Sequence, residues 1–203
     1  WIHKCVGIRY AKKARQLGAD IITVVGYENG GATGKLDIGT LVLVPAVVDA
    51  IDAPVIGGGG VSDGRGVAAL LSLGAQAVIM GTRLLVTREC PIHEDLKQAL
   101  LQASEQDTML IMRSIGATHR VWSNPAAEKC AAIEKDGGSF EEVLSVVAGD
   151  KARQMYATGQ TDVGVISCGQ GIGLVHDLPT VAELFARIMR EAVQAIQAIR
   201  VTD

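Results

Sequence analysis

The first 90 residues alternate short, largely apolar segments rich in β-branched side chains with segments that carry helix signals. The apolar segments cover residues 2–6, 21–25, 54–57 and 77–80. Continuous apolar runs are typical of parallel strands that are buried on both faces, and their alternation with helices indicates βα units. We therefore predict an α/β fold, either a doubly wound sheet or a (β/α)₈ barrel. Four such units would be half a barrel, because a complete one needs about 250 residues.

Local signals place helices between these strands. A helix over residues 10–17 would end at Gly18, because glycine favours the position that follows a helix. Asp37 can cap a helical stretch, and Pro45 fits the first turn of a second helix that runs to residue 50. A third helix is expected over residues 66–73, behind a cap formed by Ser62 and Asp63.

The pattern becomes mainly helical after residue 90. Helices are expected at 93–106, 125–135, 139–149 and 150–158, whereas residues 108–115 fit a strand or a helix. We interpret residues 1–91 as the second half of a barrel, 92–160 as a helical cap subdomain, and 161–203 as a return loop and a final helix. A capping box at Thr180 and Glu183 opens that final helix. Its apolar stripe predicts docking on a core, and the stripe consists of Leu184, Phe185, Ile188, Met189, Ala192, Val193 and Ile196.

Composition excludes several classes of partner. The net charge of −3 argues against a nucleic-acid surface, and no apolar run reaches the roughly 18 residues of a membrane span. The four cysteines are widely spaced and fit a reducing, cytoplasmic location. Cys90 and His93 have the spacing of one ligand pair, but structural zinc needs about four ligands, so we predict no metal. His93, His119 and His176 are expected to be surface or capping histidines.

Two glycine-containing turns follow consecutive predicted strands and indicate an anion site. Residues 57–60 are all glycine and precede a capped helix, and Gly81 and Thr82 end the next strand. Backbone N–H groups without side chains, together with a helix N-terminus, bind phosphates. Two such turns after consecutive strands match the standard phosphate site of a (β/α)₈ barrel, which lies between its last two βα loops.

Lys4 lies within the first predicted strand. The period of two places Ile2 and Lys4 on one face of the strand and His3 and Cys5 on the other. Lys4 would then either direct its charge at a ligand or extend its ammonium group to solvent. The loop over residues 28–34 is a further active-site loop candidate, and residues 161–173 form either a polar turn near the site or a plain connection.

Several motifs together resemble the nitronate monooxygenase (2-nitropropane dioxygenase) family, whose members are FMN-dependent TIM barrels with a helical second domain. They are residues 2–5, the loop that begins at 26–28, 54–60 with 63–66, and 80–83, in family order. Residues 87–90, 111–114 and 161–164 resemble most the branch that includes an NADH:quinone reductase. Bacterial flavin-dependent enoyl-acyl-carrier-protein reductases are similar too. The resemblance implies that this chain is the C-terminal half, whose partner is the missing N-terminal half of the barrel.

The resemblance also implies the contacts of an FMN. Its phosphate would lie on Gly58, Gly59, Gly60, Gly81 and Thr82. Lys4 would approach the flavin ring, Gly30 and Gly31 would pass close to it, and Ser167 and Gln170 would approach from the cap side.

One position departs from the family pattern. Members that oxidise nitronates carry a histidine after the glycine-rich turn, whereas this chain has Ala32 there, so the catalytic residue is unknown. Alanine cannot transfer a proton, and the hydroxyl of Thr33 is a poor base. We predict an FMN-dependent oxidoreductase that oxidises a small molecule through flavin N5. The alternatives are a reductase of quinones or enoyl thioesters that uses NAD(P)H as co-substrate, and a flavin- or phosphate-binding fragment without turnover.

Overall fold

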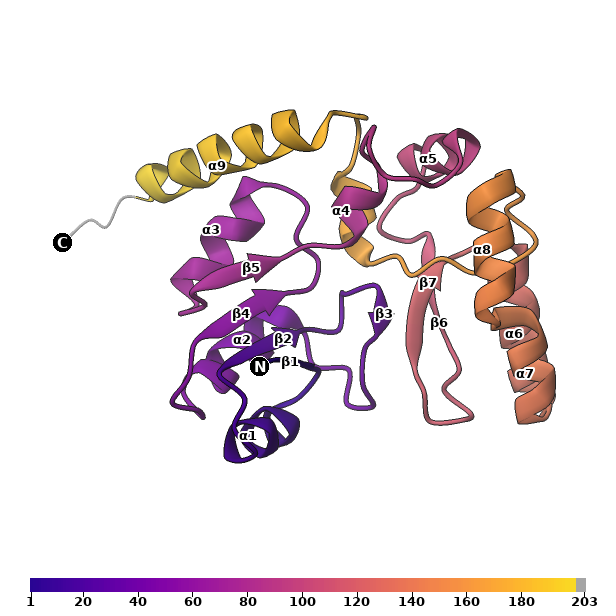
Figure 1. Cartoon of the computed structure of the whole chain (residues 1–203), viewed down its shortest axis with the longest axis horizontal. Coiled ribbons are helices and arrows are strands. Elements are labelled where there is room, and N and C mark those ends of the chain that lie inside the picture. The colour runs from indigo at the N-terminus through magenta and orange to yellow at the C-terminus, as the bar shows by residue number, and fades with distance from the viewer. Residues whose placement is uncertain (200–203) are drawn as a thin grey trace.

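The computed structural model describes residues 1–199, which form two lobes (Figure 1). The strands of the first lobe are β1 (Ile2–Cys5), β2 (Ile21–Val25), β4 (Val55–Gly58) and β5 (Ala77–Ile79). Its helices are α1 (Ile8–Gln16), α2 (Thr40–Val48), α3 (Gly64–Ser72) and α4 (Thr82–Leu85). The rest of the chain contains β3 (Gly31–Ala32), α5 (Glu94–Leu101), β6 (Thr108–Ile111), β7 (His119–Trp122), α6 (Pro125–Lys135), α7 (Phe140–Val147), α8 (Gly149–Thr158), the 3₁₀-helix η1 (Gln170–Leu174) and α9 (Val181–Ala198).

The first lobe is built on a four-stranded parallel sheet in the order β1-β2-β4-β5. The register pairs Val25 with Gly58, and Gly58 with Ile79, so the carboxyl ends of the strands meet at one edge. The prediction of an α/β fold with the strand number of half a barrel is confirmed.

Helices cover one face of this sheet. Side chains of β2 and β4 form an apolar core with α1, α2, α3 and α9, and Ile22, Val24 and Leu43 lie at its centre. The outer strands leave the opposite face open: Ile2 and Ile79 are 61% and 40% exposed. In β1, Lys4 is exposed and Cys5 is buried, as the period of two predicts.

The second helix differs from the prediction. Asp37 does not cap it, because its φ of 50° places Asp37 in a left-handed turn, and α2 begins behind Gly39. Pro45 lies inside α2 rather than in its first turn. Proline has no N–H, so the carbonyl of Leu41, an exposed residue, loses its usual helical partner.

The second lobe is not entirely helical. β6 and β7 form an antiparallel hairpin, and β3, from the glycine-rich loop of the first lobe, pairs with β7 in a sheet of order β3-β7-β6. Residues 108–111 are therefore a strand, and neither β7 nor its pairing was predicted from the sequence. The helix predicted at 93–106 ends at Leu101, since Ser104 and Asp107 then form a hydrogen-bonded turn.

Side-chain caps lie at the predicted starts of the helices at residues 125, 139 and 181. Asn124 caps α6, and capping boxes open α7 at Ser139 and α9 at Thr180. His93 caps α5 through its ring nitrogen, which accepts a hydrogen bond from the N–H of Asp95.

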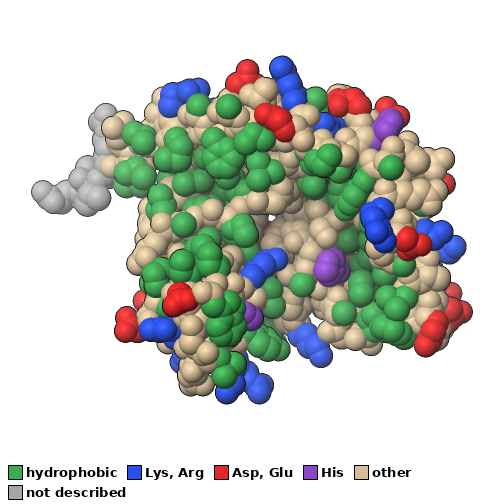
Figure 2. All heavy atoms as spheres, in the orientation of Figure 1, with side chains coloured by type: hydrophobic (Ala, Val, Ile, Leu, Met, Phe, Trp, Pro, Cys, Tyr) green, Lys and Arg blue, Asp and Glu red, His purple; other side chains and the backbone are tan. Residues whose placement is uncertain are grey.

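Only three of the seven residues of the apolar stripe on α9 are buried. Leu184, Ile188 and Ala192 are buried, where α9 packs on α3. Gly64 allows this close contact, because a Cβ at this position would lie 2.4 Å from the N atom of Ala192. The remaining stripe residues are exposed, and Figure 2 shows hydrophobic side chains gathered on this part of the surface; these residues are Phe185, Met189, Val193 and Ile196. Within residues 1–199, no helix is long and apolar enough to cross a membrane.

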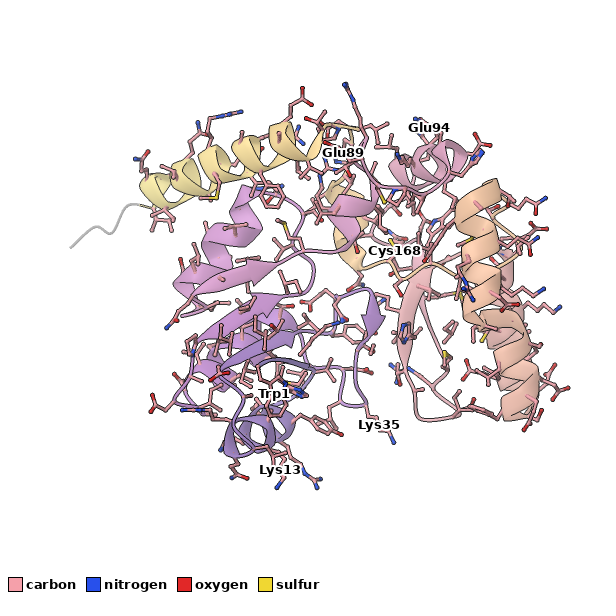
Figure 3. The ribbon with its side chains drawn as sticks, viewed as in Figure 1. Trp1, Lys13, Lys35, Glu89, Glu94 and Cys168 are labelled. Carbon is pink, nitrogen blue, oxygen red and sulfur yellow. The ribbon has the colours of Figure 1, made fainter. Side chains whose placement is uncertain are left out.

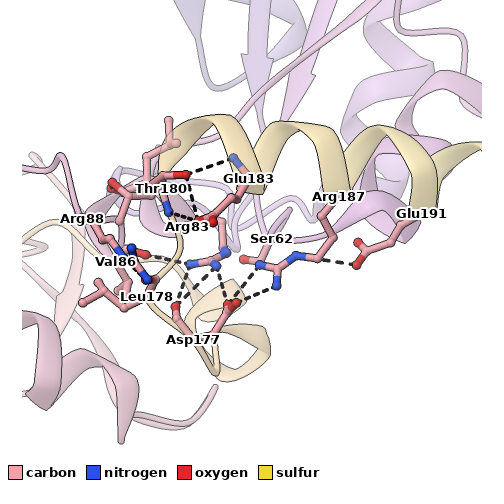
Figure 4. A network of polar contacts seen from close by, with 12 residues as sticks. Ser62, Arg83, Val86, Arg88, Asp177, Leu178, Thr180, Glu183, Arg187 and Glu191 are labelled. Atoms are coloured by element: carbon pink, nitrogen blue, oxygen red, sulfur yellow. Dashed lines mark hydrogen bonds and ion pairs between the residues drawn. The ribbon is translucent and has the colours of Figure 1, made fainter.

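A buried arginine connects α4 to α9 (Figure 4). The guanidinium of Arg83 is 2% exposed and donates to the Val86 carbonyl (3.0 Å) and to the Asp177 carboxylate (2.7 Å). Asp177 also accepts two hydrogen bonds from Arg187 of α9 (2.6 and 3.0 Å). These bonds from Arg187 are the main reason why the pKa of Asp177 is lowered.

We predict that Asp177→Asn lowers the free energy of unfolding by about 2 kcal/mol at pH 7, because Arg83 loses its ionic partner. The folded-state pKa is lowered, so this stabilisation is present above the unfolded pKa of about 3.9 and is lost as the pH falls through the folded-state value. Urea unfolding of the full-length protein from pH 7 to pH 3 tests this. Asp162→Asn, at an exposed position, is the control and should change stability by less than about 0.5 kcal/mol. An effect of Asp177→Asn that does not shrink at low pH would contradict the prediction.

Candidate functional site

A cleft of about 240 Å³ lies at the edge where the carboxyl ends of the parallel strands meet. Figure 2 shows a hollow near the centre of this face, between the two lobes. In open α/β sheets and barrels this is the edge where ligands bind. The cleft is lined by Lys4, Val25, Asn29, Gly30, Gly59, Gly60, Val61, Ser62, Ile79, Met80, Gly81, Thr82, Leu85, Ser167, Gly169 and Gly171.

Most of the predicted site residues meet in this cleft. They are Lys4, Gly30, Gly59, Gly60, Gly81, Thr82 and Ser167. Gly58 lies in β4 and does not line the cleft, and a Cβ there would come within 2.5 Å of the Ile79 side chain. Gln170 lines a neighbouring cavity beside Glu28. Gly31 lies in β3, at the side of the cleft.

The turn after β4 requires glycine for two reasons. Gly59 and Gly60 have φ angles of 107° and 72°, a region that side chains disfavour. A Cβ on Gly59 would also lie 2.4 Å from the Thr40 hydroxyl oxygen and 2.9 Å from the Gly26 nitrogen. The turn therefore packs directly against the loop that follows β2.

Glu28 and Thr40 hold this contact in place. The Glu28 carboxylate accepts hydrogen bonds from the N–H (2.9 Å) and the hydroxyl (2.8 Å) of Thr40. The Thr40 hydroxyl also lies 3.2 Å from the Gly59 carbonyl oxygen. The sequence analysis assigned neither residue a role, because the two are 12 positions apart and carry no motif of their own.

The N–H groups of Gly64, Arg65 and Gly66 at the N-terminus of α3 are occupied and do not serve the predicted anion site. The Asp63 side chain accepts hydrogen bonds from the N–H groups of Arg65 and Gly66, and the Glu191 carboxylate accepts one from Gly64 (2.9 Å). These carboxylates, one of them from the distant α9, occupy the helix end. An anion would be repelled there.

Unpaired backbone donors lie instead on the two turns themselves. Within residues 1–199, the N–H groups of Gly60, Gly81 and Thr82 have no hydrogen-bond partner in the protein. All three residues line the cleft. A Cβ on Gly81 would meet nothing within 4 Å, so open space adjoins this turn.

The loop over residues 167–171 closes one side of the cleft. The N–H of Gly169 donates to the Thr82 hydroxyl (2.8 Å), and the Ser62 hydroxyl donates to the Gly171 carbonyl (2.7 Å). Gly30 permits this approach, since a Cβ there would lie 2.8 Å from the backbone of Cys168. The Thr82 hydroxyl therefore binds this loop.

Asn29 is a cleft residue that the sequence analysis did not single out. Its amide nitrogen donates to the Ala32 carbonyl (2.9 Å). Its buried oxygen has no partner among the described residues. The only available signal was its place inside the glycine-rich loop.

His119 is not the surface or capping histidine that we expected. It is half-buried in β7, and its register partner in β3 is Ala32. Burial, and next the positive charge of Lys4, lower the pKa of His119. The pairing of β7 with β3, which no local pattern signals, brings His119 to this position.

The cysteines take no part in the site as reactive thiols. Cys168 lies between the lobes (Figure 3), and burial raises its pKa to about 12. Its thiol is therefore protonated at neutral pH, which makes it unreactive. No group of three or more metal-ligating side chains occurs within residues 1–199.

Comparison with known proteins identifies the family. The family model described as nitronate monooxygenase matches residues 2–191. The α/β fold, the cleft at the strand ends and this match agree, and the chain belongs to the nitronate monooxygenase family.

Individual relatives extend this result. A (3aS,4S,5R,7aS)-5-hydroxy-7a-methyl-1-oxo-octahydro-1H-indene-4-carboxyl-CoA dehydrogenase of Rhodococcus jostii is 32% identical over 94% of this chain and 64% of its own length. A nitronate monooxygenase of Paraburkholderia phytofirmans is 31% identical over 95% of this chain and 54% of its own. The solved structure of FabK from Thermotoga maritima superimposes with a TM-score of 0.88 at 31% identity, and covers 97% of this chain and 61% of that one. The chain thus spans less than two thirds of the length of these relatives.

We predict that Gly59→Ala destabilises the protein by about 3 kcal/mol. The left-handed backbone contributes about 1 kcal/mol and the contact with Thr40 the remainder. Gly18→Ala is the matched control, because Gly18 has a similar φ of 100° with nothing within 4 Å of its Cβ position. It should cost only about 1 kcal/mol in urea unfolding. Equal costs for the two variants would show that the close packing at Gly59 contributes nothing.

Proposed function

We propose that this chain forms the phosphate- and ring-binding part of an FMN-dependent oxidoreductase that acts on a small molecule. The observation that carries the proposal is the cleft at the strand ends, where unpaired N–H groups of Gly60, Gly81 and Thr82 lie with Lys4. Anion-binding donors and one cation around a common space suit a ligand with a phosphate and a ring that becomes anionic on reduction.

The phosphate fits the two turns. Unpaired backbone N–H groups bind phosphate oxygens, and the glycines let the group approach the backbone. The open space at Gly81 accommodates such a group. The cleft volume of about 240 Å³ is somewhat below the roughly 300–1,000 Å³ of complete ligand pockets, which suits a site with one open side.

Lys4 suits the ring. It projects from the exposed face of β1, and no salt bridge within residues 1–199 neutralises its ammonium group. When bound, the flavin would supply hydride transfer at N5, and a nearby cation stabilises its anionic reduced form. In this proposal, Ser167 and Gly30 lie at the sides of the ring.

A second candidate is a dehydrogenase or reductase of a thioester. It is favoured by Ala32, which removes the family histidine, and by the relative that is named as a carboxyl-CoA dehydrogenase. NAD(P)H would serve as the hydride donor in the reductive direction, to a quinone or an enoyl thioester. A flavin-binding protein without turnover remains the third expectation.

We also propose that further βα units complete the barrel over the open face of the sheet. The exposed Ile2 and Ile79 lie on that face, and an uncovered sheet face and edge favour association. Residues 1–203 alone should therefore aggregate or bind FMN poorly. A monomer with tight FMN binding, measured by light scattering and fluorescence, would overturn this part of the proposal.

The experiment that tests the function is anaerobic NADH titration of the full-length protein, followed by visible absorption. Flavin bands are expected, and their bleaching by NADH would favour a reductase, whereas bands that persist would favour an oxidase or a protein without turnover. The absence of flavin bands, also after incubation with FMN, would overturn the flavin proposal.

We predict that Gly81→Val raises the Kd for FMN at least tenfold, because the added side chain fills the space beside the unpaired donors. The melting temperature should remain within about 2 °C, since the Cβ position has no neighbours. Gly149→Val is the matched control, because Gly149 also has nothing within 4 Å and starts α8, away from the cleft. Equal FMN affinity of both variants would contradict the assignment of the phosphate to this turn.

A further inference from the structure

We propose that His119 is a catalytic acid–base residue of this cleft, that Ser167 is its polar neighbour, and that the substrate is a small carbon acid whose anion faces Lys4. The proposal rests on the proposed function only in that it uses the same cleft. It assigns proton transfer to His119 of β7, in the second lobe, whose register partner in the glycine-rich loop is Ala32.

The backbone brings three features together at the side of the cleft. A Cβ built on Gly31 would lie 3.5 Å from His119 Nε2 and 3.6 Å from Ser167 Oγ. The φ of Gly31 is 87°, so glycine is favoured there and no side chain separates the two polar groups from this space. The backbone of Ser167 also forms an isolated antiparallel β-bridge with Val121 of β7, two residues beyond His119. Ser167 lines the cleft, so this polar pair lies at its wall.

Both polar groups are free to bind a ligand. Among residues 1–199, neither the imidazole of His119 nor the hydroxyl of Ser167 has a hydrogen-bond partner. The neighbouring polar residues are only partly engaged. Arg120 donates to the Tyr27 carbonyl and to Thr108, and Asn29 donates to Ala32, whereas Arg120 Nη2 and Asn29 Oδ1 have no partner among the described residues. A half-buried imidazole that binds no protein group is well suited to contact a substrate.

Burial, and next the charged surroundings, determine the protonation state of His119. Lys4 faces it from β1, and its charge lowers the pKa of His119 in addition to burial. Arg120, next along β7, is also cationic and lies with its guanidinium over the Tyr27 ring at 4.4 Å. Of the acidic residues in the glycine-rich loop and the segment behind it, Glu28 accepts hydrogen bonds from Thr40 and Asp37 forms an ion pair with Arg113. The imidazole is therefore neutral at neutral pH and can accept a proton.

The step assigned to His119 is proton transfer alone. A C–H bond of the substrate breaks, its electron pair stays on the substrate as an anion, and the proton moves to the free ring nitrogen. Lys4 then stabilises the anion, and the same nitrogen returns the proton in the reverse direction. A neutral base opposite a cation suits substrates whose C–H is acidified by an electron-withdrawing group that carries the resulting negative charge.

The first test measures the placement of His119 without any substrate. In the full-length protein, NMR titration should give His119 a pKa below the ordinary value of about 6.5, and Lys4→Met should raise it. An ordinary value, or one that does not change in Lys4→Met, would overturn the facing arrangement.

The second test follows proton transfer alone. Exchange of the C1 protons of nitroethane in D₂O should be catalysed by the full-length protein and should slow at least a hundredfold in His119→Gln, whose amide is polar but cannot take up a proton. The exposed His176→Gln is the control and should exchange at the wild-type rate. Equal rates for His119→Gln and wild type, or no exchange by the wild type, would overturn the proposal. Flavin absorbance recorded on the same samples separates this failure from that of the flavin proposal, because the variant should keep the wild-type spectrum.

Discussion

The pairing of β3 with β7 is the interaction on which the shape of the site depends. Two residues, Gly31 and Ala32, leave the loop after β2 and join the edge of the hairpin in the second lobe. The Arg120 side chain strengthens the junction, since its Nε donates to the Tyr27 carbonyl at 3.2 Å while its guanidinium stacks on the Tyr27 ring. This pairing fixes the course of the glycine-rich loop, whose residues Asn29 and Gly30 line the cleft.

The parts of the fold that sequence could predict are those with local causes. β-Branched segments specify the parallel strands, and side chains such as Ser139 and Thr180 specify helix starts because their partners lie three residues away. β7 has no such signal: it is four residues long, begins with His119 and Arg120, and owes its conformation to β6 and to the distant β3. The error at Pro45 has the opposite cause, because here a local preference is overridden by packing. Proline favours the first turn of a helix, but Pro45 lies inside α2, whose packing on the sheet tolerates it.

The site shows the same division. Glycines 59 and 60 were predictable because their role depends on having no side chain, whereas the contact that requires Gly59 involves Thr40, which only the fold brings near. The helix end behind this turn has the sequence of an anion site. Its donors are occupied by Asp63 and by Glu191, 127 residues from Gly64 along the chain. The FMN contacts implied by the family resemblance remain predictions, and the structure adds to them the cleft that most of these residues share.

The position of Ala32 shows why a sequence motif within one strand does not identify every residue that can act at a site. Directly opposed residues of an antiparallel pair have Cβ atoms about 5 Å apart, so a side chain from either strand can serve nearly the same space. Ala32 is exposed and small, and its register partner is His119. A functional group lost from β3 can therefore be supplied from β7 without any change in the fold. Such an exchange leaves no trace in the local motif, because the two residues are 87 positions apart; it becomes visible only when the register of the sheet is known.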